Sequence, residues 1–279
     1  MIVDAHHHFW NPSRADYPWM TDDLASIRRR FGPDDLAPLL AATGVDRTVL
    51  VQTRASLEET REFLAIAAAT TFVAGVVGWV DLTDPAVADA IAELRGAPGG
   101  EYLVAIRHQV HDEPDAEWLR HPEVRHGIAA VGEAGLAYDL LVRPRELPSA
   151  LAIVRTLPDM RFVIDHIAKP PIKDGELQPW KDLMTGFEPL ANAWCKVSGM
   201  ITEADWSSWQ PDDLRPYLDH VLGTFGSGRL LFGSDWPVCL VAGSYQQVFD
   251  AARAALGALA PAEVEAIFGG NATEVYRLR

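Results

Sequence analysis

The first ten residues, M-I-V-D-A-H-H-H-F-W, carry the side chains best suited to chemistry. The run from Ile2 to Phe9 is mostly apolar and free of Gly and Pro, which predicts a buried strand. Side chains alternate between the faces of a strand, so His6 and His8 point one way and His7 the other. Two imidazoles about 7 Å apart on one strand edge can converge on a single metal ion or substrate group. The stretch therefore predicts one edge of a functional site.

The elements that must position these histidines alternate along the whole chain. Eight apolar runs predict strands, each followed by a segment of helical pattern, as in parallel sheets covered on both faces. Eight such units in 279 residues predict an α/β fold of the (β/α)8 TIM barrel type with a single domain. A doubly wound open sheet is the alternative, but no G-x-G-x-x-G follows the first strand. The predicted strands cover residues 2–9, 45–52, 72–82, 103–110, 136–142, 161–167, 193–198 and 229–234, and the predicted helices cover residues 33–43, 56–70, 84–95, 121–134, 144–157, 179–191, 211–223, 244–256 and 261–268.

Catalytic groups of TIM barrels lie at the carboxyl ends of the strands. His166 stands at the end of the sixth predicted strand and Asp235 at the end of the eighth, so both should meet His6 and His8 at one mouth. Three neutral imidazoles and a carboxylate form a shell suited to Zn²⁺ or Mn²⁺, which would acidify a water molecule whose proton Asp235 takes. Without a metal, Asp235 would activate water directly while the histidines hold the carbonyl or its oxyanion. The residue types leave both mechanisms open.

Further candidates for substrate contacts lie near the same strand ends. The planar fork of Arg107 suits a substrate carboxylate or ring oxygen. His108 would either face the ligand or orient a group that does. Lys169 would contact substrate or form a structural ion pair, and Lys196 would face the mouth or pair with a carboxylate inside the barrel. Trp236 and Trp10 would form a pocket wall or stack on a sugar ring, with simple core packing as the alternative for each.

Residues 11–32 form a long irregular stretch after the first strand. Loops of this length are uncommon unless they act as lids or binding loops. Trp10, Tyr17 and Trp19 could stack on a sugar from this loop, or simply pin it to the surface. We expect residues 11–32 to form a lid over the barrel mouth.

The composition limits the partners. The net charge is −15, and no basic cluster exceeds Arg28–Arg30, which argues against nucleic acid and against anionic membrane surfaces. No apolar run approaches the ~18 residues of a membrane span, and no signal peptide is visible. The two cysteines, Cys195 and Cys239, form no C-x-x-C pattern, so a reducing cytoplasm is expected. The expected partner is a small molecule, and a homo-oligomer is left open.

Several motifs together resemble the amidohydrolase superfamily, and in particular its sugar-lactone hydrolases, the L-fuconolactonase and L-rhamnonolactonase group. They include D-x-H-x-H on the first strand, D-H-I-x-K-P at 165–170 and G-S-D-W-P at 233–237. The resemblance extends to Y-P-W at 17–19, I-R-H-Q-V at 106–110, Y-D-L-L-V at 138–142 and C-K-V-S-G at 195–199, which covers nearly the whole chain.

The resemblance implies that Asp235 is the base that activates water, and that His6, His8 and His166 flank the lactone carbonyl or a bound metal. Binuclear members carry a bridging Lys or Glu at the end of strand four, where this chain has Arg107 and His108. This departure argues against a binuclear centre. The implied cofactor is none or one divalent ion, Zn²⁺ or Mn²⁺.

The resemblance therefore predicts hydrolysis of a sugar lactone, of the L-fucono or L-rhamnono type, to its aldonic acid. One alternative is a lactone isomerase of the same group, in which the same base serves transfer to a neighbouring hydroxyl. Another is a metal-dependent decarboxylase of the wider superfamily. The non-enzymatic alternative is a sugar-acid binding protein on a barrel scaffold.

Overall fold

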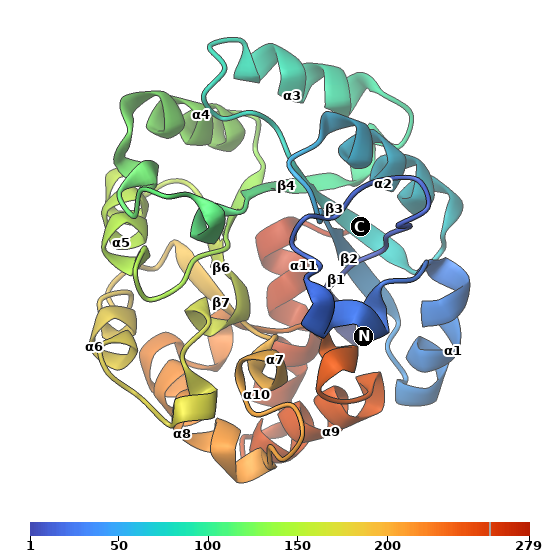
Figure 1. The fold of residues 1–279 in the computed structure, drawn as a ribbon. Coiled ribbons are helices and arrows are strands. Elements are labelled where there is room, and N and C mark those ends of the chain that lie inside the picture. Colours follow the sequence, from blue (N-terminus) through green and yellow to red (C-terminus); the bar gives the residue numbers. More distant parts are fainter. Residues whose placement is uncertain (257) are drawn as a thin grey trace.

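Eight parallel strands follow one another around a barrel in chain order, from β1 to β8 (Figure 1). The computed structural model describes residues 1–256 and 258–279. The predicted (β/α)8 barrel is confirmed, and each strand lies inside its predicted range. The strands are β1 Val3–His7, β2 Arg47–Val51, β3 Val73–Gly78, β4 Leu103–His108, β5 Ala137–Leu140, β6 Phe162–Ile164, β7 Ala193–Val197 and β8 Leu230–Phe232.

The barrel closes between β1 and the segment that follows β8. The amide of Asp235 donates to the carbonyl of His6 at 2.8 Å, and the amide of His8 donates to the carbonyl of Trp236 at 2.7 Å. His7 and Trp236 form a parallel bridge at the same place. The seam that joins the two ends of the sheet therefore runs through the predicted catalytic residues.

A ring of helices surrounds the strands, as Figure 1 shows. Proline occupies the first turn of several helices, where its missing N–H costs no hydrogen bond, and Gly44 ends α1 with φ 72°. The side chain of Ser56 caps α2 by accepting the amide of Glu59 at 3.2 Å. The helices are α1 Pro33–Thr43, α2 Leu57–Ala69, α3 Val87–Gly96, α4 Pro122–Glu133, α5 Leu147–Thr156, α6 Trp180–Thr185, α7 Met200–Glu203, α8 Pro211–Phe225, α9 Tyr245–Leu256, α10 Pro261–Glu265 and α11 Asn271–Tyr276.

Several predicted boundaries were wrong, among them the end of the third strand, which lies at Gly78 rather than at Leu82. The helix expected over 179–191 is only the short α6, because Gly186 and a turn follow it. The helix expected over 261–268 stops at Glu265, and a single π-helical turn leads into α11, which was not predicted. The sixth strand ends at Ile164 rather than at Ile167, since the backbone turns left-handed at His166.

The side chains inside the barrel change from apolar to polar along its axis. Small apolar side chains such as Val3, Ala5 and Val49 pack together with Val275 and Tyr276 of α11, which lies behind the strands in Figure 1. Charged and imidazole side chains lie beyond this apolar layer, toward the carboxyl ends of the strands. The apolar layer supports the site from below.

Residues 11–32 are irregular, as predicted, apart from one 3-10 helix, η1 Asp22–Ile27. The loop is tied at its base, where the backbones of Trp10 and Phe31 exchange hydrogen bonds of 3.1 and 3.0 Å. Its aromatic side chains pack on one another, with ring centroids of Trp10 and Trp19 5.3 Å apart. That this loop acts as a lid stays a prediction.

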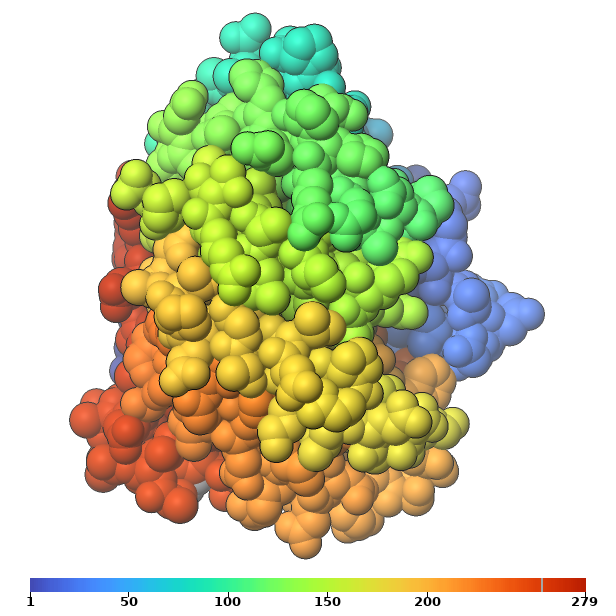
Figure 2. Space-filling model, turned by 90° about the vertical axis from the view of Figure 1, so that its left-hand side faces the viewer, coloured from blue at the N-terminus to red at the C-terminus, as the bar shows by residue number. Residues whose placement is uncertain are grey.

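Helices of the outer layer follow one another around the barrel, so the chain colours run from green to orange down the face in Figure 2. The blue N-terminal part stands out at one edge of this view. Among the residues that the structure describes, no helix is long and apolar enough to cross a membrane.

Candidate active site

A pocket of about 420 Å³ opens at the carboxyl ends of the strands. Three of the four predicted catalytic residues, His8, His166 and Asp235, line it directly, and His6 lies beneath them with no exposed surface. Arg107 of β4 also lines the pocket, and the other lining residues come from the segments that follow the strands: Trp19, Asp23, Leu24, Thr53, Gln109, His111, Asp112, Leu141, Arg143, Lys169, Thr202, Glu203, Trp206, Val238 and Val241.

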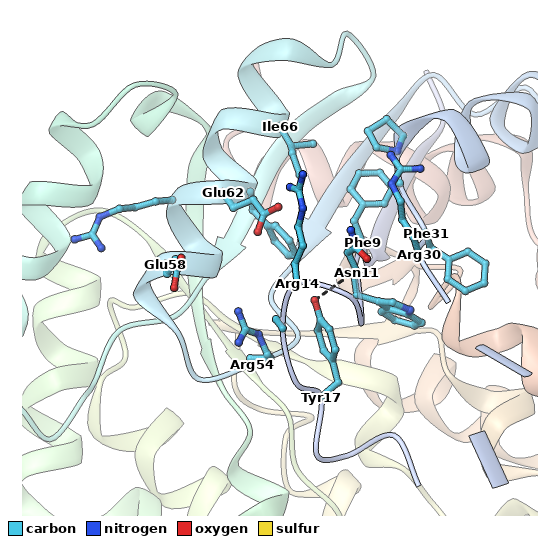
Figure 3. A pocket seen from close by; sticks show the side chains of 16 residues that line it. Phe9, Asn11, Arg14, Tyr17, Arg30, Phe31, Arg54, Glu58, Glu62 and Ile66 are labelled. Carbon is cyan, nitrogen blue, oxygen red and sulfur yellow. Dashed lines mark hydrogen bonds between the residues drawn. The ribbon is translucent and has the colours of Figure 1, made fainter. Parts of the chain in front are cut away.

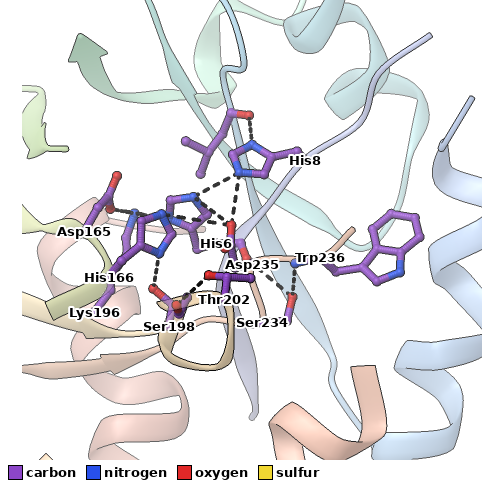
Figure 4. A network of polar contacts seen from close by, with 12 residues as sticks. His6, His8, Asp165, His166, Lys196, Ser198, Thr202, Ser234, Asp235 and Trp236 are labelled. Atoms are coloured by element: carbon purple, nitrogen blue, oxygen red, sulfur yellow. Dashed lines mark hydrogen bonds and ion pairs between the residues drawn. The ribbon is translucent and has the colours of Figure 1, made fainter. Parts of the chain in front are cut away.

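The four predicted catalytic side chains converge, as Figure 4 shows. Nε2 of His6 and Nε2 of His8 are 3.2 Å apart. One oxygen of Asp235, Oδ1, lies 3.4 Å from Nε2 of His8, 3.9 Å from Nε2 of His6 and 4.0 Å from Nε2 of His166. Three imidazole nitrogens and one carboxylate oxygen therefore surround a single point.

The protonation of His8 is fixed by its backbone partner. Nδ1 of His8 lies 2.7 Å from the carbonyl oxygen of Val51, and since a carbonyl only accepts, Nδ1 carries a proton. Nε2 then has only two roles that suit the nearby carboxylate of Asp235. Either it carries a second proton and donates to Asp235, or it offers its lone pair to a cation that Asp235 shares.

Asp235 is ionised and His166 is neutral near pH 7. Burial alone would raise the pKa of Asp235, but the facing side chains of His166, His8 and Lys169 outweigh burial and hold this pKa below its usual value. Burial lowers the pKa of His166 well below its usual value, and that of His6 likewise. A carboxylate able to accept a proton thus stands beside imidazoles free of charge.

His166 sits on a strained turn rather than on a strand. The four residues from His166 to Lys169 all have positive φ, between 46° and 60°, and Asp235 has φ 56°. Non-glycine residues in this region cost roughly 1–2 kcal/mol each, and such strain gathers at functional sites. The turn directs the His166 imidazole toward Asp235. Nδ1 of His166 lies 2.9 Å from Oγ of Ser198.

Gly199 leaves room for this imidazole. Its φ is +62°, and a Cβ at this position would lie 2.6 Å from Nδ1 of His166. We expect Gly199→Ala to lower kcat about tenfold or more, because the methyl group must displace His166 or the β7 backbone. Steady-state kinetics and thermal unfolding measure the effect. Gly223→Ala is the control, since no atom lies within 4 Å of its Cβ position; equal kinetics for both variants would contradict the prediction.

The donor set fits one divalent metal ion. His6, His8 and Asp235 offer ligand atoms that all lie within 4.8 Å of one another. Where Nε2 of His8 carries no proton, its lone pair faces the Asp235 carboxylate at 3.4 Å, an arrangement that a shared cation stabilises. One N–H of Arg107 reaches Nε2 of His6 at 3.3 Å and competes with a metal for that lone pair.

The Arg107 guanidinium, expected to bind substrate, is hydrogen-bonded mainly to other groups of the protein. Its Nη1 donates to Asp165 at 2.9 Å, its Nη2 donates to the carbonyl of Gln52, and the side chain is only 3% exposed. Only Nε has no partner within the described part of the chain. Arg107 lines the pocket, but its fork already binds Asp165 and Gln52.

Lys196 lies inside the barrel, which matches the carboxylate-pair alternative. Its Nζ contacts Asp139 at 2.6 Å and Asp165 at 2.8 Å, and all three side chains are fully buried. The hydroxyl of Tyr276 donates to Asp139 from below at 2.8 Å. Burial would raise the pKa of Asp165, but Lys196, His6 and Arg107 outweigh it and hold that pKa well below its usual value. The cluster connects the apolar floor to His6, whose Nδ1 lies 3.3 Å from Asp165.

The sequence did not identify Asp4 as a residue that supports the site. The register of β1 shifts between Asp4 and His7, which sends Asp4 outward although His6 and His8 point inward. Asp4 accepts the amide of Ser234 at 2.8 Å and the hydroxyl of Tyr245 at 3.1 Å. Burial raises its pKa to about 6 despite these hydrogen bonds. Its place in the D-x-H-x-H motif was the available signal.

Two predicted substrate-binding residues are engaged with neighbouring side chains. Lys169 lines the pocket, and its Nζ contacts Glu203 at 2.7 Å. His108 stacks on Trp118 at 4.3 Å between ring centroids, accepts from Trp79 and contacts Glu113 at 2.8 Å. His108 does not line the pocket.

The two predicted tryptophans do not line the pocket that His8, His166 and Asp235 line. Trp236 is 1% exposed and packs edge-on against Phe9 and Phe31, which matches the core-packing alternative. Trp10 donates its Nε1 hydrogen to the carbonyl of Ile27 at 3.1 Å. Trp10 lines a different depression, of about 800 Å³, between the loop after β1 and α2 (Figure 3). A substrate in the catalytic pocket would meet neither ring in this arrangement.

Known proteins are similar to this chain in fold and in sequence. A family model described as Amidohydrolase matches residues 3–278. An L-fucono-1,5-lactonase of Burkholderia ambifaria is 41% identical over 99% of this chain and 95% of its own length. An L-fucono-1,5-lactonase of Burkholderia multivorans is 37% identical over 99% and 96%. A crystal structure of an amidohydrolase from Burkholderia multivorans with bound zinc has a TM-score of 0.94 at 36% identity over the full length of both chains.

These similarities extend along the whole barrel and include both ends of its closing seam. They confirm the resemblance drawn from the motifs on strands one, six and eight. The protein belongs to the amidohydrolase family.

Proposed function

We propose that this protein hydrolyses a sugar lactone of the L-fucono type to its aldonic acid. The observation that carries the proposal is the convergence of Asp235 with His6, His8 and His166 at the floor of the pocket. The 41% identity to an L-fucono-1,5-lactonase over 99% of the chain supports the substrate class.

The geometry suits attack of water on an ester carbonyl. Asp235 accepts a proton from the water while the water oxygen bonds to the carbonyl carbon. When Oγ–H of Ser198 donates to Nδ1 of His166, Nε2 of His166 carries the proton and can donate to the oxyanion. As the tetrahedral intermediate collapses, the C–O bond of the ring breaks and Asp235 returns its proton to the leaving oxygen.

His6, His8 and Asp235 would hold the divalent ion for which their donor set is suited. Such an ion polarises the carbonyl and lowers the pKa of water. Asp165 contributes by holding Nδ1 of His6, at 3.3 Å, which directs Nε2 toward Asp235.

A pH-indicator assay over a panel of 1,4- and 1,5-aldonolactones tests the proposal. We expect kcat/KM of about 10⁴ M⁻¹ s⁻¹ or higher for an L-fucono lactone. The assay is run before and after chelation and after Zn²⁺ or Mn²⁺ is restored. Loss and recovery of activity would establish a metal requirement, whereas full activity in metal-free protein would assign the activation of water to Asp235 alone. Turnover of no lactone above the uncatalysed rate, with metal restored, would refute the proposal.

The alternatives give different products. Hydrolysis in ¹⁸O-water places one labelled oxygen in the carboxylate, whereas a lactone isomerase incorporates none. A decarboxylase releases CO₂, and a sugar-acid binding protein turns over nothing. The cytoplasmic location, a homo-oligomeric state and the lid role of residues 11–32 stay predictions.

A further inference from the structure

The segment at the carboxyl end of β2 contacts the catalytic cluster, although none of its side chains takes part in the proposed hydrolysis. The carbonyl of Val51 accepts from Nδ1 of His8 at 2.7 Å. The carbonyl of Gln52 accepts from Arg107, and Nε2 of Gln52 donates to the Arg107 carbonyl at 3.3 Å. Thr53, the next residue, lines the catalytic pocket. The position of this segment therefore affects His8, Arg107 and one part of the pocket wall.

A buried carboxylate holds the segment in place. Glu59, in the first turn of α2, is only 1% exposed. Its Oε2 accepts the amides of Thr53 and Arg54 at 2.7 and 2.9 Å. Its Oε1 accepts the hydroxyl of Thr53 and, at 3.4 Å, Nε–H of Arg54. Four donors thus face Glu59 within the described chain, and the ionised carboxylate is the form that accepts all four.

The hydrogen bond to Glu59 fixes the polarity of the Thr53 hydroxyl. A carboxylate only accepts, so the hydroxyl hydrogen of Thr53 is engaged by Glu59. The hydroxyl oxygen keeps its lone pairs, and no group in the part of the chain that the structure describes donates to them. Toward a ligand, Thr53 Oγ can therefore act only as an acceptor.

We infer that Thr53 Oγ accepts a hydrogen bond from one ring hydroxyl of the lactone, and that Glu59 is the positioning residue that presents this acceptor. The inference rests on the proposed lactonase function and adds two residues that determine substrate selection. A lactone without this hydroxyl would leave Thr53 Oγ without a donor in a nearly closed place, since Thr53 is only 4% exposed.

The test combines a change in the protein with a change in the substrate. Thr53→Val keeps the shape of the side chain without the hydroxyl, and the 2-, 3- and 4-deoxy forms of L-fucono-1,5-lactone each lack one ring hydroxyl. On removal of the critical hydroxyl, the wild type should lose about three- to tenfold more kcat/KM than Thr53→Val does. The intrinsic reactivity of each deoxy lactone affects both proteins alike, so it cancels in this comparison.

Two further variants separate the hydrogen bond from packing. Thr53→Ser retains the hydroxyl and should keep the wild-type discrimination between the parent lactone and its deoxy form. Thr156→Val is the matched control, because Thr156 is exposed on α5 and its hydroxyl bonds to the carbonyl of Ala152 in the same helix. Its discrimination should equal that of the wild type.

Glu59→Gln tests the positioning role. The two backbone amides retain the remaining side-chain oxygen, so the new NH2 group faces Thr53 Oγ and donates to it. The hydroxyl hydrogen of Thr53 is then released, and the substrate hydroxyl meets a donor in place of an acceptor. Discrimination should fall to about half or less, through KM more than through kcat. Glu62→Gln, on an exposed position of α2, should leave it unchanged.

Equal losses for the wild type and Thr53→Val on all three deoxy lactones would overturn the role of Thr53. Unchanged discrimination in Glu59→Gln would overturn that of Glu59. If Thr53→Val fails to fold, Thr53→Ala gives the same comparison. Absence of turnover on any lactone, with metal restored, would instead refute the proposed function, so the two failures are distinguishable.

Discussion

Asp235→Asn should lower kcat by about 10³-fold and leave the fold intact. Asparagine keeps the shape of the side chain but cannot take a proton from water, and a positioned general base contributes roughly 10²–10⁴ to the rate. The change also removes the negative charge that faces Nε2 of His8 at 3.4 Å and Nε2 of His166 at 4.0 Å. KM should change much less than kcat.

Asp219→Asn is the matched control, because it removes the same charge from the exposed face of α8. Its kinetics should equal those of the wild type. Circular dichroism and thermal unfolding of both variants check the fold. Activity of Asp235→Asn within tenfold of the wild type would exclude Asp235 as the base.

Lys196→Met should produce the largest loss of stability. It removes the only cation that contacts both Asp139 and Asp165 within the described structure, and leaves two buried carboxylates side by side. Breaking a buried ion pair by removing one partner costs about 3–5 kcal/mol. For a chain of this size we expect the Tm to fall by about 10 °C.

This loss should depend on pH. Burial already raises the pKa of Asp139 in the wild-type protein to about 6, above its usual 3.8, despite the opposing charge of Lys196. Without Lys196 that pKa rises further, so the folded variant favours the protonated acid. The Asp139 part of the deficit in free energy of unfolding therefore grows as the pH rises above about 6, and it is small at pH values where Asp139 is protonated in both proteins.

Urea unfolding at pH 5 and pH 8 measures this difference. The double variant Lys196→Met, Asp139→Asn removes one of the two carboxylates and should recover part of the stability at pH 8. A deficit that is equal at both pH values, with no recovery in the double variant, would contradict the ionic role of Lys196.

The barrel, and the convergence of His6, His8, His166 and Asp235 at its mouth, could be predicted from the sequence. Eight apolar runs with intervening helical patterns fix the topology, and the rule that strand ends meet at one mouth brings His166 and Asp235 to His6 and His8. This works because parallel strands are continuous apolar segments and because polar residues directly after them stand out.

Other features depend on contacts that no local pattern encodes. The register shift in β1 turns Asp4 away from its motif partners, and regular alternation could not indicate it. The left-handed turn from His166 to Lys169 contains Ile167, a β-branched residue that favours strands, so the sixth strand was predicted too long.

The side chains that Arg107 and Trp236 contact could not be predicted from the sequence either. Arg107 looked free to bind substrate, yet it is held by Asp165, 58 residues away. Trp236 directly follows Asp235 in the chain, but it packs against the aromatic rings of Phe9 and Phe31 in the core. Tertiary packing determines which neighbours such side chains contact.

The seam between β1 and the segment after β8 has a consequence for biosynthesis and for reagent design. His6 and His8 precede Asp235 by more than 220 residues, so they leave the ribosome well before Asp235 does. A nascent or truncated chain that lacks the eighth strand and the segment after it therefore contains His6 and His8 but not Asp235, the proposed base. Two halves of the gene expressed separately would regain turnover only on reassembly, which makes catalysis a reporter of fragment complementation.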